Sequence, residues 1–217
     1  MPFSDRADAG RRLAKALANY KAEQPVILAL PRGGVPVAAE IATALEAPLD
    51  LVLVRKIGVP FQSELAMGAV VDGKMPIVVR NDDVIASCGV SEQDFSAARD
   101  AQLVEIERRR KLYLGEREHP ELKERTVIVV DDGMATGATA RAALRALRLH
   151  HPRKLVLAVP VAPTESLVSL KGAADAIVCL EEYEDFGAIG LFYADFHQVS
   201  DDEVIRLLAQ HPPTNRP

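Results

Sequence analysis

The sequence predicts an α/β fold in which helices cover both faces of a parallel sheet. Five short runs are apolar without polar alternation, which is typical of strands buried on both faces. These runs are Val26–Leu30, Leu49–Val54, Val127–Val130, Leu155–Pro160 and Ala176–Leu180. Segments with helical spacing of apolar residues stand between the runs, as they do in parallel sheets. We therefore expect five core strands.

The helical segments differ in length and in how they begin. They span Asp5–Asn19, Val35–Leu45, Glu92–Leu114, Ala138–Leu149, Thr164–Leu170 and Asp201–Leu208. Thr164 follows Pro163 and is expected to open a capped helix. Ser200 is the expected N-cap ahead of an acidic first turn, and the tail from His211 onward is expected to fray.

One region departs from the simple alternation. Met67–Val79 is predicted to form a hairpin, with its turn at Asp72-Gly73. A long polar helix follows and carries Glu105/Arg109 and Glu107/Lys111 pairs at i,i+4 spacing. We interpret residues 68–125 as an insertion between the second and third core strands of a single domain that spans residues 1–217.

The composition is that of an ordinary globular protein, with 48% apolar and 26% charged residues. The two cysteines, Cys88 and Cys179, lie far apart and lack C-x-x-C spacing, so we expect free thiols and a cytoplasmic location. The N-terminus is polar from Ser4, and no apolar run approaches the ~20 residues of a membrane helix. A net charge of −5 argues against a general nucleic-acid surface.

The segment Val127–Thr139 (VIVVDDGMATGAT) carries the strongest functional pattern. An apolar strand ends in two carboxylates, and a loop of small residues then opens a helix. Ligands of parallel sheets bind at the carboxyl ends of the strands, where this loop falls. Free N–H groups at a helix N-terminus and the hydroxyls of Thr136 and Thr139 suit a phosphate monoester, and Gly137 permits close approach of the backbone.

Asp131 and Asp132 need something neutral or cationic opposite them. A sugar diol donates hydrogen bonds to carboxylates, so a ribose fits this requirement. The alternative is a solvated turn with Thr136 as a helix N-cap. The order of strand, acid pair, small loop and helix favours the ligand site.

This segment resembles the phosphoribosyl pyrophosphate (PRPP) motif of type I phosphoribosyltransferases: apolar strand, two acids, a variable pair, then small-Thr-Gly-small-Thr. Gly133 departs mildly from it, because a branched apolar residue is common there. The resemblance implies that Asp131 and Asp132 hold the ribose 2′- and 3′-hydroxyls. It also implies that the 5′-phosphate is wrapped by Ala135, Thr136, Gly137, Ala138 and Thr139. The family fold, a mainly parallel five-stranded sheet with a small hood, agrees with the strand count, and we expect hood-like structure over residues 181–210.

A second loop follows the first predicted strand. Gly33 and Gly34 leave N–H groups bare and Arg32 adds a forked cation, which together suit a pyrophosphate. A plain β–α turn is the alternative. Beside the PRPP motif, the loop resembles the pyrophosphate loop of the same family, which implies a non-proline cis peptide at Pro31-Arg32 or Arg32-Gly33.

Arg55 and Lys56 are predicted to end the second strand and to lie at the same edge of the sheet. They are either ordinary surface cations or, by the resemblance, ligands of the diphosphate. The stretch Ile57–Ala66 would then be a mobile loop that closes over the reaction centre, with Glu64 as a loop anchor or a solvated residue.

The resemblance implies Mg²⁺-dependent transfer of a 5-phosphoribosyl group from PRPP to a nitrogen acceptor, with a nucleobase as the expected acceptor, and release of pyrophosphate. Charge then builds at the anomeric carbon and ring oxygen. Arg32, Arg55 and Lys56 are the candidate catalytic residues, because they would stabilise the leaving pyrophosphate with Mg²⁺. The metal would bind largely through substrate oxygens with Asp131 and Asp132 nearby, so we expect no direct protein site for it.

The acceptor is indicated only weakly, by an aromatic cluster with a distant similarity to purine-salvage members of the family. Phe186, Phe192 and Tyr193 could stack on a flat base, and Asp195 could accept a hydrogen bond from a ring N–H. Simple packing is the alternative. A role in nucleotide salvage follows only if the first interpretation holds, and His197 is the one histidine with a candidate role.

Two other classes of protein compete with this interpretation. A regulatory module would sense PRPP or nucleotides without transfer activity and would use Arg108–Lys111 for nucleic acid, but the interspersed glutamates favour a solvated helix face. A Rossmann dehydrogenase needs G-x-G-x-x-G after the first strand and an acid at the end of the second, and neither is present. The sequence does not fix the oligomeric state, so a homodimer stays open.

Overall fold

Five parallel strands form the central sheet, in a computed structural model that describes residues 2–73 and 76–213. The order is β2-β1-β6-β7-β8, and every neighbouring pair is parallel. The strands are β1 (Val26–Ala29), β2 (Leu49–Leu51), β6 (Thr126–Val130), β7 (Lys154–Pro163) and β8 (Ala176–Tyr183). Each of the five central strands begins within or beside one of the five apolar runs, so the predicted fold class is confirmed. The last four residues of the expected tail lie outside the described residues.

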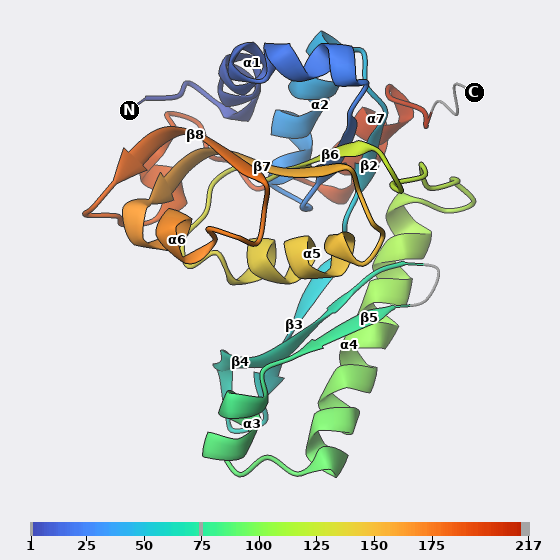
Figure 1. The fold of residues 1–217 in the computed structure, drawn as a ribbon, viewed down its shortest axis with the longest axis vertical. Helices are drawn as coiled ribbons and strands as arrows, with labels where there is room; N and C mark the ends of the chain where they lie inside the picture. The colour runs from blue at the N-terminus through green and yellow to red at the C-terminus, as the bar shows by residue number, and fades with distance from the viewer. Residues whose placement is uncertain (1, 74–75, 214–217) are drawn as a thin grey trace.

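Helices cover both faces of this sheet (Figure 1). One face is covered by α1 (Arg6–Ala16), α2 (Gly34–Leu45) and α7 (Asp201–Ala209), and the other by α5 (Ala138–Arg148) and α6 (Thr164–Ser169). Strand residues alternate between the two cores. Ile27 and Ile128 pack on the α1–α2 side, whereas Leu28 and Val129 pack on the α5 side. Because both faces are buried, the strands need no polar alternation.

Of the two predicted helix N-caps, at Ser200 and at Thr164, the structure confirms the first and not the second. Ser200 caps α7 and accepts a hydrogen bond from the Glu203 N–H at 3.1 Å, as predicted. The predicted cap at Thr164 is wrong, because Pro163 occupies the N-cap position of α6 and no side chain caps that helix. Two 3-10 helices, η1 (Ala18–Glu23) and η2 (Ile189–Phe192), complete the main body.

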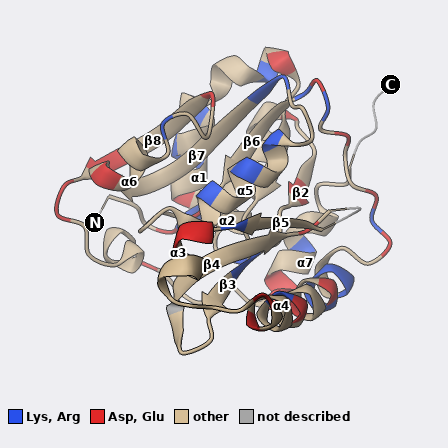
Figure 2. Cartoon of the chain, turned by 60° about the horizontal axis from the view of Figure 1, so that its bottom comes forward, with Lys and Arg blue, Asp and Glu red and all other residues tan. Residues whose placement is uncertain are grey.

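A second, antiparallel sheet projects beyond α5 and is flanked by a long helix (Figure 1). We call residues 54–114 the arm. The arm consists of β3 (Val54–Val59), β4 (Gln62–Val71), β5 (Ile77–Arg80), α3 (Asp82–Ser87) and α4 (Glu92–Tyr113). It has a small core of its own around Ile57, Met67, Phe95 and Ile106. Acidic and basic residues are interspersed along α4 (Figure 2), and the predicted Glu105–Arg109 pair is present at 2.8 Å.

The arm begins earlier than the sequence suggested. The apolar run 49–54 is split between two sheets, because β2 ends at Leu51 and β3 begins at Val54. The predicted start of the insertion at Gly68 lies inside β4, opposite Ile57. The hairpin predicted over residues 67–79 is present as β4 and β5, and residues 74 and 75 next to its turn lie outside the described residues.

After α4 the chain returns to the central sheet through a joint of charged groups around the buried carboxylate of Asp50. The Arg117 guanidinium donates to the backbone carbonyls of Leu49 and Leu208, and so ties this return segment to β2 and α7. His119 Nδ1 lies 2.7 Å from the carboxylate of Asp50, which is 1% exposed in β2. The hydrogen bond to Asp50 raises the pKa of His119, against the opposing effect of its burial. This joint fixes the base of the arm.

Candidate active site

The acid pair follows β6 at the carboxyl edge of the central sheet. Asp132 is 8% exposed and forms an ion pair with Arg6 of α1, whose Nε lies 2.8 Å from Asp132 Oδ2. Asp131 is half-buried and accepts a hydrogen bond on Oδ1 from the Asp132 N–H at 2.9 Å. Burial, together with the neighbouring charge of Asp132, raises the pKa of Asp131 well above its usual range. The two acids therefore differ: Asp132 is anchored by a cation, and Asp131 is the more accessible.

The small-residue loop after the acids opens directly into α5. Ala135, Thr136, Ala138 and Thr139 are exposed there. Gly137 stands at the N-cap with φ 71°, in the left-handed region that glycine adopts readily, and no side chain caps the helix. The first N–H groups of α5 are thus open to an anion. The Ser166 hydroxyl donates to the Ala135 carbonyl at 2.5 Å, so α6 holds the loop from behind.

The second loop connects β1 to α2 and contains the expected cis peptide, at Pro31-Arg32. Arg32 Nη1 lies 3.4 Å from Asp201 Oδ1 at the start of α7. The Tyr113 hydroxyl, from the end of α4, donates to the same carboxylate at 2.5 Å. This hydrogen bond is the main reason that the pKa of Asp201 lies below its usual value. Asp201 therefore remains an anion that holds Arg32 beside the loop.

The two loops touch one another. A Cβ atom on Gly33 would lie 2.0 Å from Asp132 Oδ2, and one on Gly34 would lie 2.6 Å from the Val130 carbonyl oxygen. Real side chains do not approach so closely, so only glycine allows the β1–α2 loop to lie against the acid pair. The Leu30 N–H donates to the Val130 carbonyl at 2.9 Å and fixes the same approach through the backbone. The structure thus brings Arg32, Gly33 and Gly34 together with the acids.

The basic pair lies elsewhere than predicted. Arg55 and Lys56 stand within β3 of the arm, opposite Val70 and Ala69 of β4, and do not end a strand of the central sheet. Arg55 Nε donates to Gln102 Oε1 on α4 at 3.1 Å. The prediction fails because β2 ends at Leu51. The chain then enters β3 of the second sheet at Val54, and Arg55 and Lys56 follow within that strand.

The predicted mobile loop over residues 57–66 is also wrong. Its residues form most of the β3–β4 hairpin, with Gly58 opposite Ala66 and Val59 opposite Gln62. Ile57 and Val59 are buried on one face of this hairpin, and that alternation is the strand signal that the glycine and proline obscured. The side chain of Glu64 lies outside the described residues.

The aromatic cluster is largely occupied by its own packing. Tyr193 is 2% exposed, packs on Phe3 with ring centroids 5.3 Å apart, and donates from its hydroxyl to the Asp132 carbonyl at 2.5 Å. Phe186 and Phe192 are half-buried and stack on each other at 5.0 Å. Tyr193 is therefore an anchor of the acid-pair backbone and does not present a face to an acceptor.

Asp195, the fourth residue predicted to bind an acceptor, is exposed and pairs with His197. Asp195 Oδ1 accepts a hydrogen bond from the His197 N–H at 3.0 Å. That bond is the main reason that the pKa of Asp195 is lowered. The Asp195 carboxylate is accessible. Along the chain, the buried Tyr193 stands between Asp195 and the stacked pair Phe186 and Phe192.

Comparison with known proteins identifies the family to which this arrangement belongs. The family model described as "Phosphoribosyl transferase domain" matches residues 4–197. The chain belongs to the phosphoribosyl transferase family. Two curated proteins, from the CDC 1551 and H37Rv strains of Mycobacterium tuberculosis, are 47% identical to it over 206 residues, and each bears the name "Putative phosphoribosyl transferase".

The lengths of these relatives differ. The match covers 95% of this chain and 46% of each mycobacterial protein, so the chain spans about half their length. The crystal structure of TT1426 from Thermus thermophilus is 40% identical, covers 98% of this chain and 100% of its own, and has a TM-score of 0.81. The whole of that solved chain therefore aligns with nearly the whole of this one.

The acid-pair edge of the sheet shows no cage for a metal in the part of the chain that the structure describes. Among the residues that the structure describes, no group of three or more His, Cys, Asp or Glu side chains could hold an ion. Two carboxylates at the sheet edge, Asp131 and Asp132, fit a Mg²⁺ ion that takes most of its ligands from substrate oxygens and water. Within the same described residues, no helix has the length and apolar content to cross a membrane.

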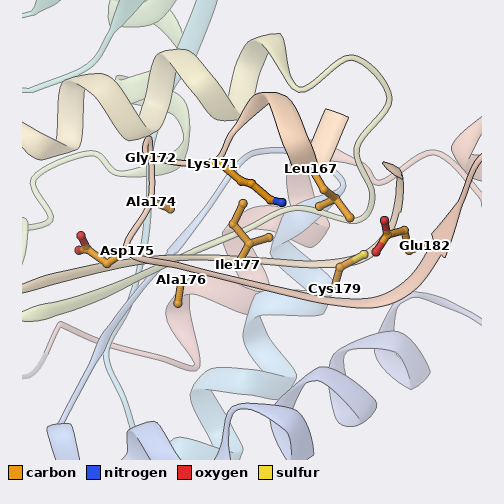
Figure 3. A pocket seen from close by; sticks show the side chains of 9 residues that line it. All are labelled: Leu167, Lys171, Gly172, Ala174, Asp175, Ala176, Ile177, Cys179 and Glu182. Atoms are coloured by element: carbon orange, nitrogen blue, oxygen red, sulfur yellow. The ribbon is translucent and has the colours of Figure 1, made fainter. Parts of the chain in front are cut away.

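A cleft of ≈ 450 Å³ lies apart from this site, along the free edge of β8 and beside α6 (Figure 3). Leu167, Lys171, Ile177, Cys179 and Glu182 contribute to its lining. Burial raises the pKa of the Cys179 thiol to about 11, so this thiol is protonated at neutral pH and is a poor nucleophile. The cleft therefore offers a cavity without a reactive thiol, and we assign no reaction to it.

Arg6 is the site residue that sequence reasoning missed. It stands 126 positions before Asp132, in a helix with an ordinary amphipathic pattern. Its burial at 7% exposure is the property that distinguishes it from the neighbouring Arg11 and Arg12, and burial is not visible in a single sequence.

Proposed function

We propose that this protein transfers a 5-phosphoribosyl group from PRPP to a nitrogen acceptor, with Mg²⁺, and releases pyrophosphate. The observation that carries the proposal is the contact between the two loops, where the position of a Gly33 Cβ lies 2.0 Å from the Asp132 carboxylate. PRPP bears a ribose diol between a 5′-phosphate and a pyrophosphate. A site for it needs an acid pair with one anion-binding loop on each side, and the carboxyl edge of this sheet offers that arrangement.

Each loop has a distinct task in this proposal. The exposed segment 135–139 and the open N-terminus of α5 bind the 5′-phosphate. Asp131 and Asp132 accept hydrogen bonds from the ribose hydroxyls. Arg32 and the N–H group of Gly33 hold the pyrophosphate, whose negative charge grows as the glycosidic bond breaks. The expected bare N–H of Gly34 is wrong, because it donates to the Leu30 carbonyl at 3.0 Å; Gly34 contributes only the close approach of the loop to the acid pair. Mg²⁺, held near Asp131 and Asp132 through substrate oxygens, would neutralise part of that charge.

The arm takes part in the proposed reaction only if it moves towards the edge of the central sheet. Arg55 and Lys56 lie in β3, and they can assist the leaving group only if the arm approaches the sheet edge during turnover. We therefore assign Arg32 as the principal cation for the pyrophosphate and treat the arm residues as auxiliary.

The acceptor is proposed to be a nucleobase, which would place the protein in nucleotide salvage. Phe186 and Phe192 offer a half-buried aromatic surface, and Asp195 offers an exposed hydrogen-bond acceptor. Tyr193 takes no part, because it is buried beneath the acid pair.

A panel of purine and pyrimidine bases, each incubated with PRPP and Mg²⁺, tests the reaction through pyrophosphate release. We expect one base or a small group of related bases to give release that stops when Mg²⁺ is chelated. An Arg32→Gln variant should strongly lower that release, because it removes the cation assigned to the pyrophosphate. Binding of PRPP without release for any nitrogen acceptor would contradict transfer activity.

A regulatory module that binds PRPP without transfer is the second candidate. The observation in its favour is the location of Arg55 and Lys56 away from the sheet edge. The ion pairs on α4 argue against a module that binds nucleic acid through this helix. Arg108 and Arg109 each pair with Glu105 at 2.8 Å. These ion pairs hold the pKa of Glu105 at about 2, so the basic run is matched by carboxylates that stay charged.

A further inference from the structure

The side chain of Arg6 makes three separate contacts at the edge of the sheet. Its Nε lies 2.8 Å from Asp132 Oδ2, and its Nη1 donates to the His197 carbonyl oxygen at 2.8 Å. The guanidinium also lies over the ring of Phe196, 3.9 Å from the ring centroid. Arg6 is 7% exposed, so these contacts leave it little freedom to turn. The first helix and the segment 196–197 are thereby locked to the acid pair.

Asp132 is restrained by two further segments. The Tyr193 hydroxyl donates to its backbone carbonyl at 2.5 Å, and the ring of Tyr193 stacks on Phe196 with centroids 5.1 Å apart. On the opposite side, both carboxylate oxygens lie within 2.8 Å of the point where a Gly33 Cβ would stand. Three parts of the chain that are distant in sequence thus converge on Asp132.

A purely structural ion pair would not account well for this arrangement. A buried ion pair is often no more stabilising than apolar packing of the same volume, because both charges lose their hydration. Within the described residues, the side-chain hydrogen bond to this carboxylate goes to Oδ2. Oδ1 retains accepting capacity beside the half-buried Asp131 and next to the pyrophosphate loop.

We propose that Arg6 is a positioning residue that holds Asp132 so that its carboxylate meets a ribose hydroxyl of the substrate. This inference rests on the proposed function, because it assigns Arg6 to the ribose part of the PRPP site. Arg6 does not touch the ligand, and it acts by fixing the orientation of the Asp132 carboxylate. Its loss should therefore weaken recognition of the sugar hydroxyls and spare recognition of the pyrophosphate, which depends on Arg32.

The test compares ligands as well as variants. Wild-type protein, Arg6→Gln and Arg6→Lys are titrated by calorimetry with PRPP, ribose 5-phosphate, 2-deoxyribose 5-phosphate and inorganic pyrophosphate, all with Mg²⁺. Arg12→Gln is the matched control, because Arg12 lies on the same helix and pairs at the surface with Asp8. Circular dichroism establishes that each variant is folded.

We expect the wild type to prefer ribose 5-phosphate to the deoxy sugar by about tenfold or more, since a charge-assisted hydrogen bond is worth about 1.5 kcal/mol or more. Arg6→Gln should lose most of that preference and bind PRPP about tenfold more weakly, with pyrophosphate affinity unchanged. Arg6→Lys should recover part of the preference, because it keeps the charge but loses the planar fork. Arg12→Gln should match the wild type.

Two results overturn the inference and are distinguishable. If folded Arg6→Gln retains the sugar preference, or loses affinity for all four ligands equally, Arg6 is structural and the proposed function still stands. If the wild type binds neither PRPP nor ribose 5-phosphate, the proposed function fails and the role of Arg6 in sugar recognition fails with it. Should Arg6→Gln not fold, Arg6→Lys and Phe196→Leu decide the matter, because each keeps a cation beside Asp132 but loosens its orientation: Lys lacks the planar fork, and Leu removes the ring over which the guanidinium lies. An unchanged sugar preference in both folded variants would then contradict the inference.

Discussion

The two sheets of this protein present charged residues in different ways. In the central sheet, Arg32, Asp131 and Asp132 stand in loops after the strands end, near the N-terminus of α5, which no side chain caps. In the arm, Arg55 and Lys56 stand inside β3, where antiparallel pairing with β4 fixes the backbone and α4 holds Arg55 through Gln102.

This difference indicates which of the two regions should contribute more to the binding of PRPP. Residues at strand ends can converge on one ligand together with free N–H groups, whereas residues within a paired strand offer side chains alone. We expect binding of PRPP to depend on the edge of the central sheet much more than on the arm.

The largest effect expected of a single substitution comes from removing a cation from each of the two regions in turn. Arg32→Gln should weaken binding of pyrophosphate and PRPP by about 10- to 100-fold, because a charge-assisted hydrogen bond contributes about 1.5–3 kcal/mol. Arg55→Gln should weaken it by no more than about threefold, as expected of a cation that acts only after the arm moves. Calorimetry on both variants measures the contrast. Equal losses would show that the arm belongs to the binding site in its resting position.

The contact between the two loops gives the next effect. Gly33→Ala would place a Cβ 2.0 Å from the Asp132 carboxylate, so one of the loops must shift. Such overpacking costs about 1–3 kcal/mol, and we expect PRPP affinity to fall by about tenfold. Gly187→Ala is the control, because its Cβ would meet only the end of the Leu191 side chain. Wild-type affinity in Gly33→Ala would mean that the loops need not touch for binding.

The joint at the base of the arm predicts a dependence of stability on pH. The folded-state pKa of His119 is raised above 6.5 by Asp50, so its contribution is fully present below the unfolded pKa and is lost as pH rises through the folded pKa. His119→Gln should lower the free energy of unfolding by about 1 kcal/mol at pH 5.5, because His119 is partly exposed and solvent screens the pair. The difference from wild type should shrink towards pH 8.5. Urea unfolding at several pH values measures it, and a difference that grows with pH would contradict this sign.

The smallest effect concerns the anion that holds Arg32. Asp201 lies 3.4 Å from Arg32 and competes with a bound pyrophosphate for the guanidinium. A partly exposed pair is worth about 0.2–1 kcal/mol, so Asp201→Asn should strengthen pyrophosphate binding by about 1.5- to 5-fold. Asp202→Asn removes the same charge from the next residue and should leave affinity nearly unchanged. Weaker binding in Asp201→Asn would show that Asp201 orients Arg32 for the ligand.

The sequence predicted the features that depend on local pattern. Strand β6, the acid pair and the glycine loop before α5 are contiguous over 14 residues, Thr126–Thr139, and their order alone indicates a ligand site. The five parallel strands were likewise visible as apolar runs. Burial on both faces removes polar alternation from β1, β2, β6 and β7, whereas the edge strand β8 is apolar although only half-buried.

The sequence could not predict what depends on contacts between distant segments. The break between Leu51 and Val54 lies inside one continuous apolar run, so nothing local marks the passage from one sheet to the other. The pairing of Arg6 with Asp132 joins residues 126 positions apart. The same holds for Tyr193, which looked like part of an aromatic acceptor site and is instead the buried donor to the Asp132 carbonyl.

The central claim is that the carboxyl edge of the five-stranded sheet binds PRPP through its acid pair. Titration calorimetry with PRPP and Mg²⁺ on the wild type and on the Asp131→Asn/Asp132→Asn variant tests it most directly, with circular dichroism as the check on folding. We predict measurable binding by the wild type and none by the folded double variant. Unchanged PRPP affinity in that variant would contradict the account.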